Sequence, residues 1–260
     1  MTVVIITSSR NGMASMCLPT LAKDPRMLIG GVILSQGRIV NRRRFFVRKL
    51  NKLIKIGVLG AINGRRIRSW YTSKRPDIEC ICRELHVPFY EVPSLNGSEM
   101  QLVLKDLNPD VGLSLGNGYI ASRIFMIPRL GMLNVHSEIL PAYQNAQSII
   151  WPIFCNDPYT GFTIHEISDR IDAGRILYQR RIPIEFQPTL EDTVRHNRMI
   201  VEEMIPIALA EVCSNIMEFK SNAMEQVGGG RFTTPNIWQF MRMKRNNRRF
   251  YETVSKKISP

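Results

Sequence analysis

The chain has 260 residues, of which 44% are apolar and 22% are charged, a composition that is typical of a folded globular protein and excludes a disordered or collagen-like chain. No apolar run approaches the roughly 20 residues that a membrane span requires, and the N-terminal residues lack the basic prefix of a secretory signal, so we expect a cytoplasmic protein. The five cysteines are odd in number and include no CxxC pair, which argues against a disulfide framework and a structural zinc site.

The excess positive charge is concentrated in one segment. The chain carries 35 Lys and Arg against 22 Asp and Glu, a net charge of +13. Residues 38–75 contain 13 of these basic residues and no acidic residue, so the rest of the chain balances to zero. Residues 241–260 hold a smaller cluster of seven basic residues and one acidic residue. Charge gathered in this way speaks against a surface coated for general nucleic-acid binding, and we predict no nucleic-acid partner.

The N-terminal half alternates predicted strands and helices. Residues 2–8 alternate β-branched and small residues and lead into a Ser-Ser-Arg-Asn-Gly turn, which predicts a strand, a turn and the start of a helix. In chain order we then expect a strand over 27–34, a helix over 77–85, a strand over 88–92, a helix over 98–107 capped by Ser98, and strands over 110–115 and 132–136. This alternation predicts an α/β fold with a doubly wound, mostly parallel sheet.

The C-terminal half is expected to add a helical region. We predict a helix over 146–155, strands over 161–167 and 175–184, a long helix over 190–216, and a short helix over 236–243 after the Gly228-Gly229-Gly230 run. The chain is accordingly divided into a core over 1–184, with 38–75 as a basic insertion, and a C-terminal helical region with a basic tail over 185–260 that packs on the core.

The basic insertion is predicted to form an amphipathic cationic helix. Its apolar and basic residues alternate at helical spacing: Phe45, Phe46, Leu50, Leu53, Ile54 and Val58 on one side, with Arg48, Lys49, Lys52 and Lys55 between them. Three interpretations remain open, namely a solvated helix packed on the domain, a docking site for an anionic substrate or partner, and a contact with a membrane surface.

Polar residues stand where two predicted strands end. Ligands of open α/β sheets bind outside the carboxyl ends of the strands, so these residues are candidates for a site. The strand over 110–115 is followed by Gly116-Asn117-Gly118-Tyr119, whose glycines let the backbone approach a flat ligand. Asn134 and His136 lie two residues apart on an extended segment and therefore face the same side. The polar loop that ends in Asp172 supplies carboxylates.

These residues resemble the formyltransferases that use 10-formyltetrahydrofolate. That family has an Asn-x-His pair, a Leu-Pro, a Trp-containing helix, a Gly-x-Thr-x-His strand and a loop ending in Asp-x-Gly. The chain has the same elements in the same order: Asn134-Val135-His136, Leu140-Pro141, Trp151, Gly161-Phe162-Thr163-Ile164-His165 and Asp172-Ala173-Gly174. The resemblance, firm over 110–184, implies a Rossmann-like formyltransferase fold for the core and a one-carbon transferase activity.

The resemblance assigns catalysis to Asn134, His136 and Asp172. Moving a formyl group to an amine needs a donor for an oxyanion and a base for the amine, roles that suit Asn134 and His136, while Asp172 would orient the imidazole. The resemblance further implies that 10-formyltetrahydrofolate is the co-substrate and that no metal is required. It places the folate between two loops, in contact with Gly118, Tyr119, Ile120, Ser168, Asp169, Arg170 and Ile171.

Two departures from the family pattern lie on the acceptor side. The Pro-Ser that often follows the histidine is Ser137-Glu138 here, and the usual Tyr-x-Gly is Tyr143-Gln144-Asn145. These departures and the compact chain resemble the branch that formylates nucleotide-linked amino sugars, with GDP-perosamine for lipopolysaccharide O-antigen synthesis as the expected acceptor. We expect acceptor contacts from Ser9, Arg10, Tyr143 and Asn145.

Two alternatives stay open. The acceptor could instead be methionyl-tRNA or another amine, although only 76 residues follow Ile184 and the tRNA enzymes carry a further barrel domain. A function of another class is a catalytically idle homologue that binds an anionic partner or a membrane through the basic helix. A homodimer is expected in either case.

Overall fold

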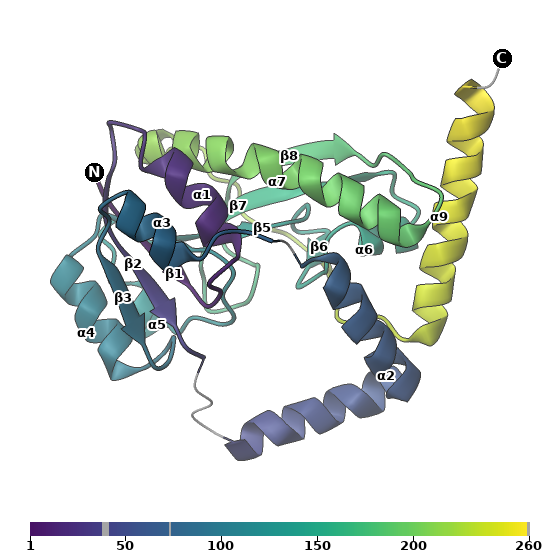
Figure 1. Cartoon of the computed structure of the whole chain (residues 1–260), viewed down its shortest axis with the longest axis horizontal. Coiled ribbons are helices and arrows are strands. Elements are labelled where there is room, and N and C mark those ends of the chain that lie inside the picture. The colour runs from purple at the N-terminus through teal and green to yellow at the C-terminus, as the bar shows by residue number, and fades with distance from the viewer. Residues whose placement is uncertain (38–41, 73, 259–260) are drawn as a thin grey trace.

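The computed structural model describes residues 1–37, 42–72 and 74–258 and contains a seven-stranded sheet with the strand order β3-β2-β1-β4-β5-β7-β8 (Figure 1). Five neighbouring strands run parallel: β1 (Thr2–Thr7), β2 (Leu28–Ser35), β3 (Phe89–Val92), β4 (Val111–Ser114) and β5 (Met132–His136). The last two, β7 (Tyr159–Glu166) and β8 (Ile176–Pro183), are antiparallel. The predicted doubly wound, mostly parallel α/β sheet with a helical C-terminal region is confirmed.

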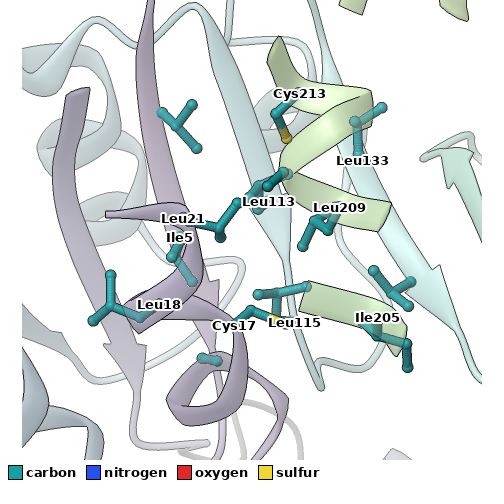
Figure 2. Close-up of a cluster of buried hydrophobic side chains, with 14 of the residues drawn as sticks. Ile5, Cys17, Leu18, Leu21, Leu113, Leu115, Leu133, Ile205, Leu209 and Cys213 are labelled. Carbon is teal, nitrogen blue, oxygen red and sulfur yellow. The ribbon is translucent and has the colours of Figure 1, made fainter. Parts of the chain in front are cut away.

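Helices cover both faces of the sheet. One face packs against α1 (Met13–Leu21), α3 (Ile78–Glu84) and α7 (Leu190–Ser214), and the other against α4 (Ser98–Leu107) and α5 (Ser122–Phe125). Figure 2 shows the first of these layers, in which Leu18 of α1 and Leu209 of α7 lie against Ile5 and Leu113 of the sheet. Because β1 and β4 are covered on both sides, their sequences are almost continuously apolar rather than alternating.

A third apolar cluster joins the C-terminal region to the core. It centres on Trp70, Trp151 and Phe240, which come from α2 (Arg42–Trp70), α6 (Ile150–Phe154) and α9 (Ile237–Ile258). A short ladder lies nearby: β6 (Tyr143–Gln144) pairs in parallel with β9 (Gly230–Arg231). The helix α8 (Ile216–Ser221) follows α7 directly. This ladder ties the segment after the glycine run to the loop that follows β5.

The predicted basic helix is present and is longer than expected. Gly57, with a φ of +73°, interrupts α2, and in Figure 1 the half before this kink lies apart from the sheet, below the rest of the fold. The apolar residues predicted to form one face include Leu50 and Ile54, both exposed. Some of the predicted pattern lies outside what the structure describes: residues 38–41 and 73, and the side chains of Phe45, Arg48, Lys52 and Lys55.

Two predicted helix ends and one predicted N-cap are wrong. The residue that caps α4 is Gly97 and not Ser98, whose hydroxyl donates to Glu99 within the helix. The helix predicted over 146–155 begins only at Ile150, because Ile149 takes a left-handed conformation with a φ of +70°. The C-terminal helix predicted over 236–243 continues to Ile258. Within the described residues, no helix is long and apolar enough to cross a membrane.

Gly161 lets β7 and β8 approach each other closely, and we expect Gly161→Ala to destabilise the fold. A Cβ at this position would lie 1.9 Å from the carbonyl oxygen of Arg180, so the two strands would have to separate. The expected loss is about 3 kcal/mol in the free energy of unfolding, measured by urea denaturation. Gly118→Ala is the control, because a Cβ there meets no atom within 4 Å. Equal stability of the two variants would contradict the close approach.

Candidate active site

A cleft of about 430 Å³ opens where β4 and β5 end. Four segments line it: the loop after β4, the end of β5, residues 145–148, and the loop after β7. Its volume is in the range of small-molecule sites, and its position outside the carboxyl ends of parallel strands is where open α/β sheets bind ligands.

The structure brings the three predicted catalytic residues to this cleft. Asn134 and His136 reach it from β5, and Asp172 reaches it from the loop after β7. The Nδ1 atom of His136 lies 3.6 Å from Oδ2 of Asp172, and both side chains are 11% exposed. A fourth polar residue, His165, stands opposite Asn134 in the register between β5 and β7. An amide, two imidazoles and one carboxylate therefore meet at one end of the cleft.

The partners of His165 fix its tautomer. Its Nδ1 atom lies 2.8 Å from the carbonyl oxygen of Glu166 and must carry the proton, since a carbonyl can only accept. Burial lowers the pKa of His165, which favours the neutral ring. The Nε2 atom is then an acceptor and takes a hydrogen bond from Nδ2 of Asn134 at 3.1 Å. This bond fixes the orientation of the Asn134 amide and leaves its second N–H for a ligand.

The same reasoning applied to His136 identifies its basic nitrogen. Its Nε2 atom lies 2.8 Å from the carbonyl oxygen of Tyr143 and must donate to it. In the neutral ring, Nδ1 is therefore the unprotonated nitrogen, and it faces the carboxylate of Asp172. A proton taken up at Nδ1 would lie beside a negative charge, so His136 is placed to act as a base at that atom.

Two contacts hold Asp172 in place. The backbone N–H of Asn145 donates to Oδ2 of Asp172 at 2.8 Å. After Asp172, the loop turns back closely along the end of β7, because Gly174 packs on the backbone of Glu166. A Cβ on Gly174 would lie 1.9 Å from the carbonyl oxygen of Glu166. The glycine of the Asp-x-Gly motif thus has a steric reason in this structure.

Glu138, which the sequence comparison placed on the acceptor side, is instead buried and outside the described lining of the cleft. Its Oε1 atom accepts hydrogen bonds of 2.6 Å from both the backbone N–H of Ile149 and the hydroxyl of Thr160, and Oε2 accepts one of 3.2 Å from Ile139. Ile149 directly follows residues 145–148, which line the cleft. By binding its N–H, Glu138 anchors one wall of the site. Burial raises the pKa of Glu138 to about 8.

This raised pKa predicts a dependence of stability on pH. The pKa of an unfolded glutamate is about 4.3, so between that pH and pH 8 the folded state binds the proton more tightly and unfolding becomes easier as the pH rises. From pH 5 to pH 8 the wild type should lose stability relative to Glu138→Gln, by at most about 1.4 kcal/mol per pH unit. Urea denaturation at several pH values measures the difference. Parallel profiles for the two proteins would contradict the assignment.

The residues predicted to hold a folate largely border the cleft. Gly118, Tyr119 and Ile120 line it from the loop after β4, and Ser168, Arg170 and Ile171 line it from the loop after β7, whereas Asp169 is outside the described lining. Gly116, with a φ of +79°, and Gly118 present bare backbone, since a Cβ on either would meet no atom within 4 Å. Exposed backbone between two loops fits a flat heterocycle.

Only some of the residues predicted to contact an acceptor lie at the cleft. Asn145 lines the cleft, whereas Ser9 and Arg10 are outside the described lining. The Arg10 guanidinium pairs with Asp77, Glu79 and Glu91, so its charge is already compensated. The side chain of Tyr143 is buried and donates to Asp157, and its contribution to the site is the carbonyl that orients His136.

Three further cleft residues had no strong signal in the sequence. Tyr71 lines the cleft just after α2, and its hydroxyl donates to the carbonyl oxygen of Ser148 at 2.5 Å. Ser148 and its neighbour Gln147 were predicted to be helical and instead form the wall of the site. His165 was part of the Gly-x-Thr-x-His motif in the sequence, and the structure shows that its contact at the cleft is with the Asn134 amide.

Comparisons with known proteins agree with this geometry. Residues 69–209 match the family model described as formyl transferase, which covers more than half of the chain. The methionyl-tRNA formyltransferase of Lysinibacillus sphaericus is 34% identical over 111 residues, which are 42% of this chain and 36% of that protein. The chain thus spans about a third of the length of this relative.

Solved structures show the same fold at low sequence identity. The phosphoribosylglycinamide formyltransferase of Anaplasma phagocytophilum has a TM-score of 0.58 at 13% identity, covering 89% of this chain and 99% of that one. A sugar 3N-formyl transferase, crystallised in the presence of dTDP and 5-N-formyl-THF, has a TM-score of 0.55 at 15% identity, covering 97% of this chain and 81% of that one. With its matched residues spanning the cleft from Tyr71 to Asp172, the chain belongs to the formyl transferase family.

Proposed function

We propose that the protein transfers a formyl group from 10-formyltetrahydrofolate to the amine of a nucleotide-linked amino sugar. The observation that carries this proposal is the arrangement of Asn134, His136 and Asp172 at one end of the cleft. It provides a hydrogen-bond donor and a base side by side, which are the two groups that acyl transfer to an amine requires. The folate would supply the formyl group, and the family of the chain supports its use.

The chain's own residues divide the work of this reaction. The bare backbone at Gly116 and Gly118 and the loop over 168–171 would bind the folate and position its formyl group. The free N–H of the Asn134 amide donates to the formyl oxygen as that oxygen gains negative charge, and neutral His165 keeps the amide turned toward it.

His136 handles the proton. Its Nδ1 atom would accept a proton from the attacking amine and return it to the folate nitrogen that leaves when the bond from that nitrogen to the formyl carbon breaks, while Nε2 remains bonded to the carbonyl oxygen of Tyr143. Asp172 lies 3.6 Å from Nδ1 and stabilises the charged ring that results. Because Asn145 donates to the same carboxylate oxygen, Asp172 keeps this position before and after the proton moves.

An amino sugar nucleotide, and GDP-perosamine in particular, is the acceptor that we propose. The similarity to the sugar 3N-formyl transferase extends over 97% of this chain, and that enzyme was crystallised in the presence of a nucleotide diphosphate. Methionyl-tRNA is the second candidate, because the curated relatives that match the sequence carry that name. Those matches end within the chain: the one from Lysinibacillus sphaericus covers 42% of it.

A panel of acceptors separates these proposals. The full chain is incubated with 10-formyltetrahydrofolate and with GDP-perosamine, other GDP- and dTDP-linked amino sugars, or charged initiator tRNA, and mass spectrometry detects the added formyl group. A formylated GDP-linked sugar is the expected product. Formylation of the tRNA alone would overturn the sugar acceptor and retain formyl transfer. Loss of the folate's formyl group without any acylated amine would overturn the transferase and indicate a hydrolase.

A further inference from the structure

The helix α2 exposes an apolar stripe that the described chain does not cover. Seven large apolar side chains are exposed to between 40% and 74%: Val47, Leu50, Leu53, Ile54, Val58, Leu59 and Ile62. The opposite side of the second half of α2 packs normally, since Ile67 and Trp70 are buried in the third apolar cluster. A helix usually turns its apolar side toward a core, and an exposed patch of this kind marks an interaction surface.

The stripe is flanked by positive charge. Before the kink at Gly57, the positions of Val47, Leu50, Leu53 and Ile54 fall within about 120° of the helix circumference, at ~100° per residue. Between 44 and 55 the positions that carry Arg or Lys in the sequence fall on the remaining circumference at the same spacing. An apolar face with a cationic face around it is typical of a helix that lies in a membrane interface.

The positive charge of residues 38–75 decides which kind of partner surface could cover the stripe. Residues 38–75 contain 13 basic residues and no acidic one. A second copy seated on this face would bring two such segments together in a self-complementary interface, with strong repulsion. An anionic lipid surface instead offers hydrocarbon for the stripe and phosphates for the cations, without a groove of matching shape.

We propose that the first half of α2 docks the protein on an anionic lipid bilayer. The kink at Gly57 leaves this half apart from the sheet, below the rest of the fold (Figure 1). It can therefore lie flat in the headgroup region with its apolar stripe toward the acyl chains. The contact is peripheral, because no helix within residues 1–37, 42–72 and 74–258 could cross a membrane. The cleft and its catalytic side chains take no part in the docking.

The start of α9 packs beside the second half of α2 and exposes a further large apolar side chain. Residues 235–236 approach α2 at Gly60, where a Cβ would lie 3.3 Å from the Cα atom of Asn236. Trp238 follows directly and is 80% exposed. Tryptophan is the residue type that prefers the boundary between headgroups and hydrocarbon, so we include Trp238 in the docking surface.

Vesicle sedimentation of the full chain tests the proposal. The vesicles are phosphatidylcholine alone or with about a quarter phosphatidylglycerol, a fraction that gives an anionic surface. We expect binding to the anionic vesicles only, reduced at least about tenfold in the double variant Leu50→Ser and Ile54→Ser, which keeps every charge. The control is the double variant Leu28→Ser and Leu102→Ser, which removes two equally exposed leucines elsewhere and should bind as the wild type does. Circular dichroism and formyl transfer verify that all variants are folded.

Tryptophan emission gives a second measurement. Trp70 and Trp151 are 2% exposed, so a change on adding vesicles reports on Trp238. A blue shift with anionic vesicles that is absent in Trp238→Phe is expected.

Four results would overturn the proposal. The first is absence of binding to the anionic vesicles. The second is equal binding by the wild type and the Leu50/Ile54 variant. The third is light scattering that shows a dimer lost in that variant, which would assign the stripe to a second copy. The fourth is binding of poly-glutamate but not vesicles, which would assign it to an acidic protein.

Discussion

His136→Ala is expected to lower the rate of formyl transfer by about 100-fold or more, because it removes the base that takes the amine's proton at Nδ1. The loss should appear in kcat measured with saturating folate and acceptor, since the imidazole acts on the proton rather than on folate binding. The side chain is 11% exposed and lies beside the Tyr143 carbonyl and the Asp172 carboxylate at the end of the cleft rather than in an apolar cluster, so its removal should leave the fold intact.

His196→Ala is the matched control for this measurement. His196 is also paired with a carboxylate, Glu185, but it is exposed and distant in sequence from every segment that lines the cleft. Its replacement should leave kcat unchanged. Full activity of His136→Ala with a normal circular dichroism spectrum would remove His136 from the mechanism.

Asn134→Ala is expected to lower kcat by about 100- to 1,000-fold, the effect of deleting one donor to an oxyanion. The amide N–H that the mechanism uses is oriented by the bond to His165 at 3.1 Å, so the donor is held in place before substrate arrives. Steady-state kinetics with the acceptor identified by the panel measure the loss.

His165→Gln separates the two contributions of Asn134. Glutamine can still accept from the Asn134 amide, so this variant should retain much of the activity that Asn134→Ala loses. If His165→Gln and Asn134→Ala fall to the same rate, then Asn134 acts by positioning His165 and is not itself the donor.

The strands and most helices could be predicted because their signals are local. Asp77, for example, accepts from the backbone N–H of Glu79 and caps α3 where the sequence placed a helix start. The ends that were wrong depend on distant partners. Ile149 is left-handed beside the Glu138 carboxylate, which no periodicity reveals. The C-terminal helix continues through two asparagines, Asn246 and Asn247, whose side-chain N–H groups donate to the carbonyl oxygens of Phe154 and Gln187.

Site residues that belong to a sequence motif could be predicted. Roles that depend on segments brought together by the fold could not. Asn134, His136 and Asp172 were found from their motif and do meet in the cleft. Arg10 stands in a turn at a helix N-terminus, as a phosphate ligand would, but nearby carboxylates pair with it. The role of Glu138 follows from its burial between β5, β7 and the loop before α6, a three-dimensional property that the sequence does not carry.

The short ladder between β6 and β9 gives the C-terminal segment influence over the histidine. The carbonyl that orients His136 belongs to Tyr143, which pairs with Gly230, and the Asn145 side chain donates to the carbonyl oxygen of Phe232. Asn145 in turn holds Asp172. Insertion into the preceding glycine run would therefore slow turnover without altering any described residue that lines the cleft. In this chain, the residues paired with Tyr143 and Asn145 can therefore adjust the catalytic rate from outside the pocket.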